Sequence, residues 1–384
     1  MKGYMRQRGG SWELRVFLGH DPVTGKQRYA NRTVRGGKRE AQRALAAMIT
    51  EAEQGLTARS AATVAELLEA WFDQAAPDFS PATAKETRGY LDRSLLPGLG
   101  GRRLAKLKPG DIDAFYRRLR ESGGVGGKPL APATVRRIHG ILRRALAQGV
   151  RWGWIGVNPA ASASPPKVPA PKVAPPDPEQ LARLLARARD ESPDFACFVL
   201  VAAATGARRS ELVALRWDDV DQTEATLDIS RGIVVGRDGL VEKDTKTHSS
   251  RRVSLDAQTA AVLAEHREQM AARAQTCGVD LADDAFVFSN APDCTLPWFP
   301  GSVSRSFKRL CEKEGIAGVR LHDLRHFVAT QLLGAGVDVR TVAGRLGHRN
   351  AATTLNVYAH FLEQSDRAAA DVIGNLISGS DWER

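Results

Sequence analysis

Three short motifs in the second half of the chain carry residues suited to chemistry on a phosphodiester. They are TGARRSEL over Thr205–Leu212, HDLRH over His322–His326 and RLGHRNAATTLNVYAHF over Arg345–Phe361. Together they offer two arginines, two histidines and a tyrosine that follows the last histidine by ten residues. This set suits the attack of a phenolic oxygen on a phosphodiester.

Cutting a phosphodiester without metal or water places clear demands on side chains. Negative charge builds on the non-bridging oxygens in the transition state, and guanidinium groups can fork two donors onto two such oxygens. A phenol with a pKa of about 10 needs a base or a strongly positive site. The leaving 5′ oxygen needs a proton donor. The resulting covalent ester stores the bond energy for rejoining, so we expect no nucleotide cofactor.

The first motif supplies Arg208. It follows Gly206, and a glycine there lets a helix begin close to another backbone. Glu211 comes three residues after Arg208, on the same helical face, where it can orient the guanidinium. An ordinary helical ion pair is the alternative interpretation of this spacing.

The second motif supplies His322 and Arg325, which are three residues apart and therefore project from the same side of a helix. His326 lies one turn from His322 and is open to a structural role. We favour Arg325 as the phosphate ligand.

The third motif supplies His348 and Tyr358. His348 sits in a Leu-Gly-His turn, where Gly347 permits a tight backbone. In one continuous helix, ten residues at about 100° each would point His348 and Tyr358 in different directions. A break near Asn350 must therefore bring the two side chains together.

Composition narrows the class of protein around these motifs. The chain has 384 residues, enough for two or three domains, and 55 Lys+Arg against 44 Asp+Glu give a formal net charge of +11. This balance favours a polyanionic partner, and double-stranded DNA fits the chemistry. Four scattered cysteines without a CxxC pair indicate neither a metal site nor disulfides. No apolar run predicts a membrane helix or a signal peptide, so we expect a cytoplasmic protein.

The pattern of apolar residues and prolines divides the chain into four parts. Residues 1–57 predict a small sheet plus one helix, residues 62–157 predict helices, and residues 179–384 predict a mixture of helices and strands. Residues 158–178 hold eight of the 19 prolines and predict a semi-extended linker. The fold class is therefore multidomain and mainly α, with small β-sheets.

The first part combines strand patterns with positive charge. Apolar residues alternate along SWELRVFLG, and QRYANRTVR also predicts a strand. Residues 1–60 hold 12 Lys+Arg against five Asp+Glu. We expect this sheet to lie against duplex DNA, with Arg28 and Arg32 on one face of a strand as DNA ligands. A solvated basic face is the alternative.

In the helical part, Arg136 and Arg137 lie beside an apolar stripe that includes Ile138, Ile141 and Leu142. If the stripe packs in the core, these arginines remain available for phosphates. A solvated charged face is again the alternative.

The three motifs in this order make the chain resemble a tyrosine recombinase, specifically an integrase of the phage or mobile-element type. The resemblance covers nearly the whole chain, and no key motif position departs from the pattern. It implies catalytic roles for a set of residues, namely Arg208, Lys246, His322, Arg325, His348 and Tyr358. Lys246, in TKTHSSRR, matches the lysine that the family carries on a β-hairpin as general acid, with Lys243 as the alternative.

The resemblance also implies an architecture and a reaction. Residues 1–57 correspond to an arm-type DNA-binding domain, residues 62–157 to a helical core-binding domain, and residues 179–384 to an α+β catalytic domain. Metal-independent cleavage forms a 3′-phosphotyrosyl link, and strand exchange proceeds through a Holliday junction, typically in a tetramer on DNA. An excisionase-like directionality protein is the further partner that the resemblance implies.

Three alternatives share part of this pattern. A type IB topoisomerase-like enzyme uses the same chemistry within one duplex, and a replicon-dimer resolvase usually lacks the arm domain. A non-enzymatic DNA-binding protein with a decayed site is the third. The filled motif positions argue against decay, and the separate basic N-terminal part favours recombination.

Overall fold

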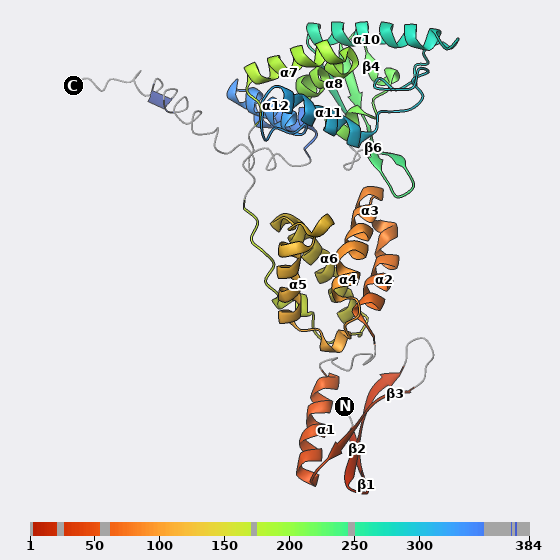
Figure 1. Ribbon diagram of the computed structural model, residues 1–384, viewed down its shortest axis with the longest axis vertical. Coiled ribbons are helices and arrows are strands. Elements are labelled where there is room, and N and C mark those ends of the chain that lie inside the picture. Colours follow the sequence, from red (N-terminus) through yellow and green to blue (C-terminus); the bar gives the residue numbers. More distant parts are fainter. Residues whose placement is uncertain are drawn as a thin grey trace, which may run out of the picture. The chain divides into compact units, whose positions relative to one another are not determined.

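The computed structural model describes residues 3–20, 27–53, 62–169, 175–244 and 250–348, together with residues 370, 373 and 374. The chain divides into two units, Met1–Ala170 and Pro171–Arg384. Helices dominate and the sheets are small (Figure 1). This is the fold class that the sequence predicts.

A three-stranded antiparallel sheet begins the chain. It consists of β1 (Gly3–Arg8), β2 (Ser11–His20) and β3 (Gln27–Arg35), and the helix α1 (Lys38–Glu53) packs against it. Alternating apolar residues of β2 turn inward, so Leu14 and Val16 are fully buried against Ala41 and Met48 of α1. The helix therefore covers one face of the sheet and leaves the other uncovered.

Residues 62–162 form a helical bundle. Its elements are α2 (Val64–Ala75), a 3₁₀ turn (Ala76–Asp78), α3 (Pro81–Tyr90), a π-helical turn (Leu91–Leu95), α4 (Leu96–Leu99), 3₁₀ turns (Leu104–Lys106 and Val125–Gly127), α5 (Pro109–Ser122) and α6 (Pro132–Arg151). Thr63 caps α2 and Ser80 caps α3 through their side-chain oxygens. The apolar stripe of α6, including Ile138 and Leu142, is buried in the bundle core.

The linker predicted over 158–178 differs from the structure in its first part. Pro159–Ser162 forms a 3₁₀ helix that packs against α5 and α6, and Ala160 is fully buried. Asn158 caps this turn by accepting from the backbone N–H of Ala160 at 2.9 Å. A proline at the first helical position is compatible with such a turn, because its missing N–H would have no helical partner there. The bundle therefore extends into the predicted linker.

The second unit mixes helices with short strands. Its helices are α7 (Pro178–Glu191), α8 (Pro193–Thr205), α9 (Arg209–Leu212), a 3₁₀ turn (Trp217–Asp219), α10 (Ala257–Gln275), α11 (Pro300–Lys313), α12 (Asp323–Gly334) and α13 (Val339–Leu346). Its strands are β4 (Val220–Asp221), β5 (Thr226–Ile229), β6 (Arg231–Val235), β7 (Leu240–Asp244) and β8 (Arg251–Ser254).

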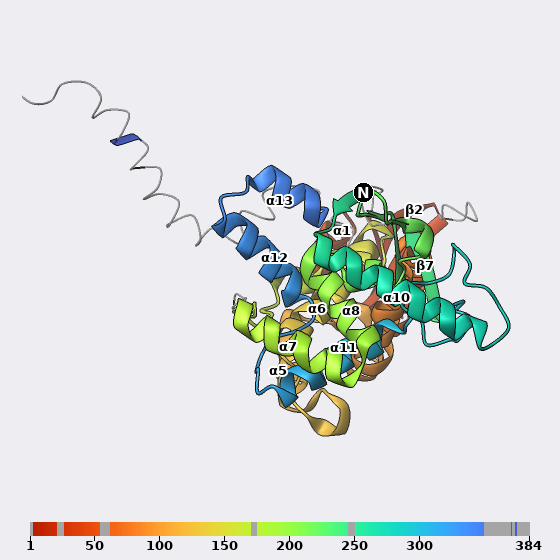
Figure 2. The ribbon, with the colours of Figure 1, turned by 90° about the horizontal axis from the view of Figure 1, so that it is seen from above.

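Helix α8 is the central element of this unit. It is apolar on nearly all sides, with Phe198, Val199 and Val201 fully buried, and it contacts α7, α10 and α12. Helices α12 and α13 pack against each other at one end of the unit (Figure 2). The first motif begins at the C-terminal end of α8, so it is held by a buried helix.

Two small sheets complete the unit. Strands β4, β5 and β8 form one antiparallel sheet, and β6 and β7 form a hairpin, with Gly232 opposite Lys243. Gly236 to Gly239 lie at the turn of this hairpin, and the backbone N–H of Gly236 donates to the carbonyl of Gly239 at 2.7 Å. Strand β8 thus belongs to a different sheet from β7, although it is the next strand in the chain.

Among the described helices, none is both long and apolar enough to cross a membrane. The four cysteines are free thiols, and only Cys277 is exposed.

Candidate active site

Arg208 lies in the turn between the buried helix α8 and the short helix α9. Helix α8 ends at Gly206, whose backbone is left-handed with φ of 65°. A Cβ at this position would lie 2.5 Å from Cδ2 of Leu346, so glycine allows α8 to end tightly against α13. The sequence predicts a close approach to another backbone at Gly206, whereas the nearest atoms belong to the side chains of Leu346 and Val328.

Glu211 binds both the side chain and the backbone of Arg208. Its Oε1 accepts from Nη1 of Arg208 at 2.7 Å, and its Oε2 accepts from the backbone N–H of Arg208 at 2.8 Å. The Glu211 side chain is 4% exposed, whereas that of Arg208 is 37% exposed. Burial alone would raise the pKa of Glu211, but hydrogen bonds and charge from Arg251 and Arg208 outweigh it and lower that pKa. The carboxylate stays ionised while the Arg208 guanidinium remains accessible.

Arg325 reaches the same turn from α12. It is 4% exposed, and its Nη1 donates to the carbonyl of Gly206 at 2.8 Å. His322 forms the N-cap position of α12, one residue before its first turn. The second motif is therefore attached to the turn that carries Arg208.

His322 and His326 form an edge-to-face pair with ring centroids 5.2 Å apart. Burial lowers the pKa of both imidazoles, and the positive charge of Arg325 lowers each further. Both rings are therefore mainly neutral at neutral pH, in which state an imidazole can accept a proton.

His348 follows the end of α13. Gly347 ends that helix with φ of 66°, and the backbone N–H of His348 donates to Ala343 at 2.9 Å. Burial, and then the charges of Arg325 and Arg208, lower the pKa of His348 to about 4. Nη2 of Arg208 also donates to the carbonyl of Gly347 at 3.1 Å. The described parts of all three motifs thus meet at one place.

This arrangement suits stabilisation of a negatively charged transition state. Two guanidinium groups from separate elements are fixed by backbone carbonyls, and neutral imidazoles lie in the same motifs. Preorganised charge of this kind costs no reorganisation during the reaction, and it acts most strongly in a site with little water.

Comparisons with known proteins agree with this geometry. A model of the phage integrase family matches residues 177–365, and a model of the N-terminal SAM-like domain of phage integrases matches residues 63–120. The tyrosine recombinase XerD of Caulobacter vibrioides is 31% identical over 296 residues, which cover 72% of this chain and 82% of that protein. The chain belongs to the phage integrase family of tyrosine recombinases.

Two further likenesses extend over most of the chain. The ICEBs1 integrase of Bacillus subtilis is 24% identical over 371 residues, covering 96% of this chain and 98% of that protein. The structure of a lambda integrase tetramer bound to a Holliday junction shares the fold, with a TM-score of 0.59, 17% identity and coverage of 90% of this chain and 96% of that one. The predicted family, fold class and enzyme class, a tyrosine-type site-specific recombinase, are confirmed.

Two predicted catalytic residues of this recombinase, Lys246 and Tyr358, lie outside the described residues. The expected break near Asn350 lies outside them as well. Lys243, the alternative to Lys246, is described: it is half-buried in β7, opposite Gly232 of β6. The roles of both lysines and of the tyrosine stay predictions.

Sequence reasoning missed Arg251, at the start of β8. Its Nη2 donates to Oε2 of Glu211 at 2.7 Å, and its Nε donates to the carbonyl of Arg345 at 2.9 Å. A signal was available in the sequence, because Val253 is two residues further along the same strand. Val253 is buried, and the two-residue repeat of a strand places Arg251 on the same inner face.

Two of the predicted DNA ligands of the recombinase, Arg136 and Arg137, lie on α6. Arg136 and Arg137 are exposed on α6, as expected from the apolar stripe. Nη1 of Arg136 donates to the carbonyl of Pro166 at 3.3 Å, and Arg137 forms an ion pair with Glu86. Neither contact buries the arginine, so both remain candidates for phosphate contacts.

Arg28 and Arg32, the other two predicted DNA ligands, are less well supported by the structure. Arg32 pairs with Leu14 across β2 and β3 and therefore shares the face that α1 covers. It stays exposed on an edge strand. Arg28 belongs to β3, but its side chain lies outside the described structure. The sequence predicts that these arginines share a face, and the register assigns Arg32 to the side of the helix.

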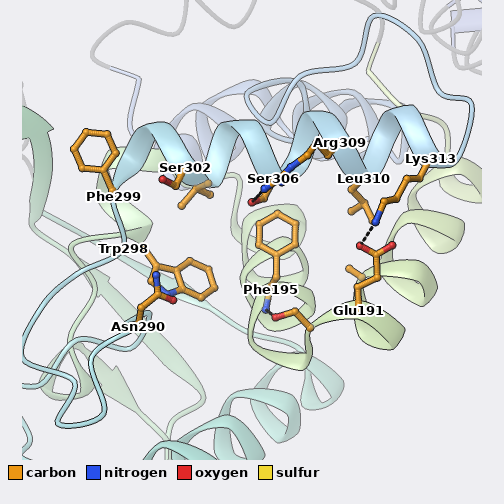
Figure 3. A pocket seen from close by; sticks show the side chains of 13 residues that line it. Glu191, Phe195, Asn290, Trp298, Phe299, Ser302, Ser306, Arg309, Leu310 and Lys313 are labelled. Atoms are coloured by element: carbon orange, nitrogen blue, oxygen red, sulfur yellow. Dashed lines mark hydrogen bonds and ion pairs between the residues drawn. The ribbon is translucent and has the colours of Figure 1, made fainter.

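A separate pocket of about 470 Å³ lies between the α7–α8 corner and α11 (Figure 3). Phe195 and Trp298 line it, and an ion pair of 2.7 Å joins Lys313 to Glu191 beside it. None of the residues that line this pocket belongs to the three motifs. The pocket is therefore distinct from the candidate active site.

Proposed function

We propose that this recombinase integrates a phage or another mobile element into DNA by cutting and rejoining strands through a 3′-phosphotyrosyl intermediate. The observation that carries the proposal is the joining of Arg208 and Arg325 at one turn, with His348 next to them. Such a pair of fixed guanidinium groups suits a scissile phosphate. The family and the likeness to the ICEBs1 integrase support integration as the biological outcome.

In the proposed reaction, Oη of Tyr358 attacks the scissile phosphorus. A bond forms between phosphorus and the phenolic oxygen, and the bond between phosphorus and the 5′ oxygen breaks. His322 and His348 are the neutral groups that can accept the phenolic proton. Lys246 gives a proton to the leaving 5′ oxygen, while Arg208 and Arg325 hold the non-bridging oxygens.

The freed 5′ hydroxyl then attacks the phosphotyrosyl bond of a partner duplex, which restores the tyrosine and joins the strands. Exchange between two duplexes requires several active sites on one DNA assembly. We therefore propose a tetramer on DNA, and the likeness to the lambda integrase tetramer on a Holliday junction supports it. A cytoplasmic location and an excisionase-like partner stay predictions.

We also propose that the uncovered face of the N-terminal sheet binds a second class of DNA site. The register places Arg6, Arg8, Arg15 and Arg35 on the face opposite α1. Tyr4 is 58% exposed on the same face, and the Arg15 guanidinium stacks over the Tyr29 ring at 3.8 Å. Charged and planar groups on an uncovered sheet face suit phosphates and base edges. These residues replace Arg28 and Arg32 as our preferred DNA ligands.

The proposed function is tested with a nicked suicide duplex taken from the ends of the element that carries the gene. We expect a covalent protein–DNA adduct that survives excess EDTA and is absent for Tyr358→Phe, which should still bind the duplex. A normal adduct yield from Tyr358→Phe would remove the tyrosine from its role. Loss of cleavage in EDTA, restored by magnesium, would contradict the metal-independent mechanism.

A second assay separates integration from related activities. Two plasmids, each with one attachment site, should yield a recombinant of summed length. Relaxation of supercoils without recombinants would instead indicate a topoisomerase-like enzyme. Recombination restricted to two short core sites on one replicon would favour a resolvase.

A further inference from the structure

Arg251 connects elements that carry different catalytic motifs. It lies at the start of β8, and its side chain is 9% exposed. Its Nη2 and Nη1 donate to Oε2 and Oε1 of Glu211 at 2.7 and 3.3 Å, and its Nε donates to the carbonyl of Arg345 at 2.9 Å. The guanidinium thus ties β8 to α9 and to the last turn of α13.

Two arginines share the carboxylate of Glu211. Arg208 binds it from the accessible side and Arg251 from the covered side, and Glu211 itself is 4% exposed. Without Arg251, a buried carboxylate would keep a single guanidinium partner and would attract it more strongly. Arg208 would then be drawn toward Glu211 and away from a substrate phosphate.

The same guanidinium also packs beneath the turn of the third motif. A Cβ on Gly347 would lie 2.8 Å from Nη1 of Arg251, so the backbone of this turn rests almost directly on the arginine. His348 is the next residue, and the charge of Arg251 contributes to its electrostatic surroundings. Arg251 therefore touches the supports of both Arg208 and His348.

Contact between Arg251 and the substrate is a poorer explanation. The side chain is nearly covered, and Nε, Nη1 and Nη2 all donate to protein acceptors. Each guanidinium nitrogen already donates to a protein acceptor, and the covered side chain is poorly placed to present two donors to phosphate oxygens.

We propose that Arg251 is a positioning residue of the recombination site, which sets the orientation of Arg208 through Glu211 and supports the turn that carries His348. This inference rests on the proposed function, because it assigns Arg208 to the scissile phosphate. It adds a residue from outside the three motifs to the cleavage machinery.

The test compares three variants of the full-length protein in single-turnover cleavage of the nicked suicide duplex. Arg251→Gln removes the charge, and Arg251→Lys keeps the charge but lacks the fork. Arg252→Gln is the matched control, since Arg252 is the next residue on β8 and pairs with the exposed Asp228 at 2.8 and 3.0 Å. We expect Arg251→Gln to cleave about 10- to 100-fold more slowly and Arg252→Gln to remain near wild type.

Two readouts separate positioning from simple loss of structure. Arg251→Lys should recover most of the melting temperature that Arg251→Gln loses, because it keeps a positive charge beside Glu211. It should recover little of the cleavage rate, because an ammonium lacks the planar fork that bonds Glu211 and the Arg345 carbonyl in one fixed orientation. The double variant of Arg251→Gln with Arg208→Lys should lose less rate than the product of the two single losses, because part of the effect of Arg251 acts through the Arg208 guanidinium.

Two outcomes overturn the inference. One is cleavage by Arg251→Gln within about threefold of wild type. The other is multiplication of the two rate losses in the double variant, which would mean that Arg251 acts independently of Arg208. Wild-type protein and Tyr358→Phe are run beside these variants. If wild type forms no adduct, or Tyr358→Phe forms a normal one, then the proposed function fails rather than the role of Arg251.

Discussion

Arg208 donates a hydrogen bond from Nη2 to the carbonyl oxygen of Gly347 at 3.1 Å, across 139 residues of sequence. Arg325 makes the complementary link, from its Nη1 to the carbonyl of Gly206. Each arginine is thus attached to the backbone of a different motif. The two guanidinium groups are therefore positioned by the folded protein itself, before any DNA binds, as electrostatic preorganisation requires.

This preorganisation predicts a large loss of cleavage when either arginine is replaced. Arg208→Ala and Arg325→Ala should each slow adduct formation by about 100- to 1,000-fold, and lysine should restore little because it lacks the planar fork. Arg208 is part-exposed whereas Arg325 is buried. We therefore expect a larger fall in melting temperature for Arg325→Ala than for Arg208→Ala.

Arg209→Lys is the control for these arginine variants, because Arg209 is adjacent to Arg208 but its Nη1 bonds to Ser304. It should cleave close to the wild-type rate. Near-normal cleavage by Arg325→Ala would assign the phosphate to another residue.

The turn at Gly347 predicts a specific sensitivity to a methyl group. Gly347→Ala must place a side chain in the left-handed region, at a cost of about 1–2 kcal/mol, and would push against Arg251. We expect a lower melting temperature and slower cleavage, measured by thermal unfolding and the suicide duplex. Gly344→Ala is the matched control, because it lies within α13 and its Cβ would meet no atom within 4 Å. Equal behaviour of the two variants would rule out a special role for the turn.

The structure brings together Arg208, Arg325 and His348, three motif residues whose signals in the sequence are local. Arg208 follows Gly206 by two residues and His348 follows Gly347 by one. Both glycines have a left-handed backbone conformation. The contact between Glu211 and Arg251 spans 40 residues and depends on how β8 packs, which no local pattern specifies. The position of Arg32 could have been inferred, since Ala30 and Val34 lie two residues on either side of it and share its face.

The leaving-group proton gives a prediction that distinguishes two lysines. A bridging 5′-phosphorothiolate leaves without protonation, so it should restore cleavage selectively to the variant that lacks the general acid. We expect rescue of Lys246→Ala. Lys243→Ala is the matched comparison, because Lys243 lies in β7 three residues earlier. Rescue of Lys243→Ala alone would reverse the assignment.

The low pKa of His348 predicts acid sensitivity of the free protein. An unfolded histidine titrates near pH 6.5, whereas His348 titrates at about 4. Between these values the unfolded chain binds more protons, so this contribution to stability is full above about 6.5 and is lost as the pH falls. His348→Gln should therefore show a smaller drop in melting temperature from pH 7.5 to pH 5.0 than wild type. An identical drop would mean that His348 is not held neutral by the fold.

The uncovered face of the N-terminal sheet leads to a prediction about two classes of DNA site. Protein lacking residues 1–57 should still cut a core-site suicide duplex, because none of the three motifs lies in that segment. It should lose recombination between full attachment sites. Normal integration by this truncated protein would exclude an arm-binding role and would favour the resolvase interpretation.

Single substitutions on the two faces of the sheet sharpen this test. Arg6→Gln and Arg15→Gln alter the uncovered face, whereas Arg32→Gln makes the same charge change on the face that α1 covers. Each lost phosphate contact should reduce the slope of log affinity against log salt by about one. We expect that reduction for Arg6 and Arg15 in binding of the full-length protein to an arm-site duplex, with little change for Arg32. A larger effect at Arg32 would indicate that the edge strand β3, rather than the open face, meets the DNA.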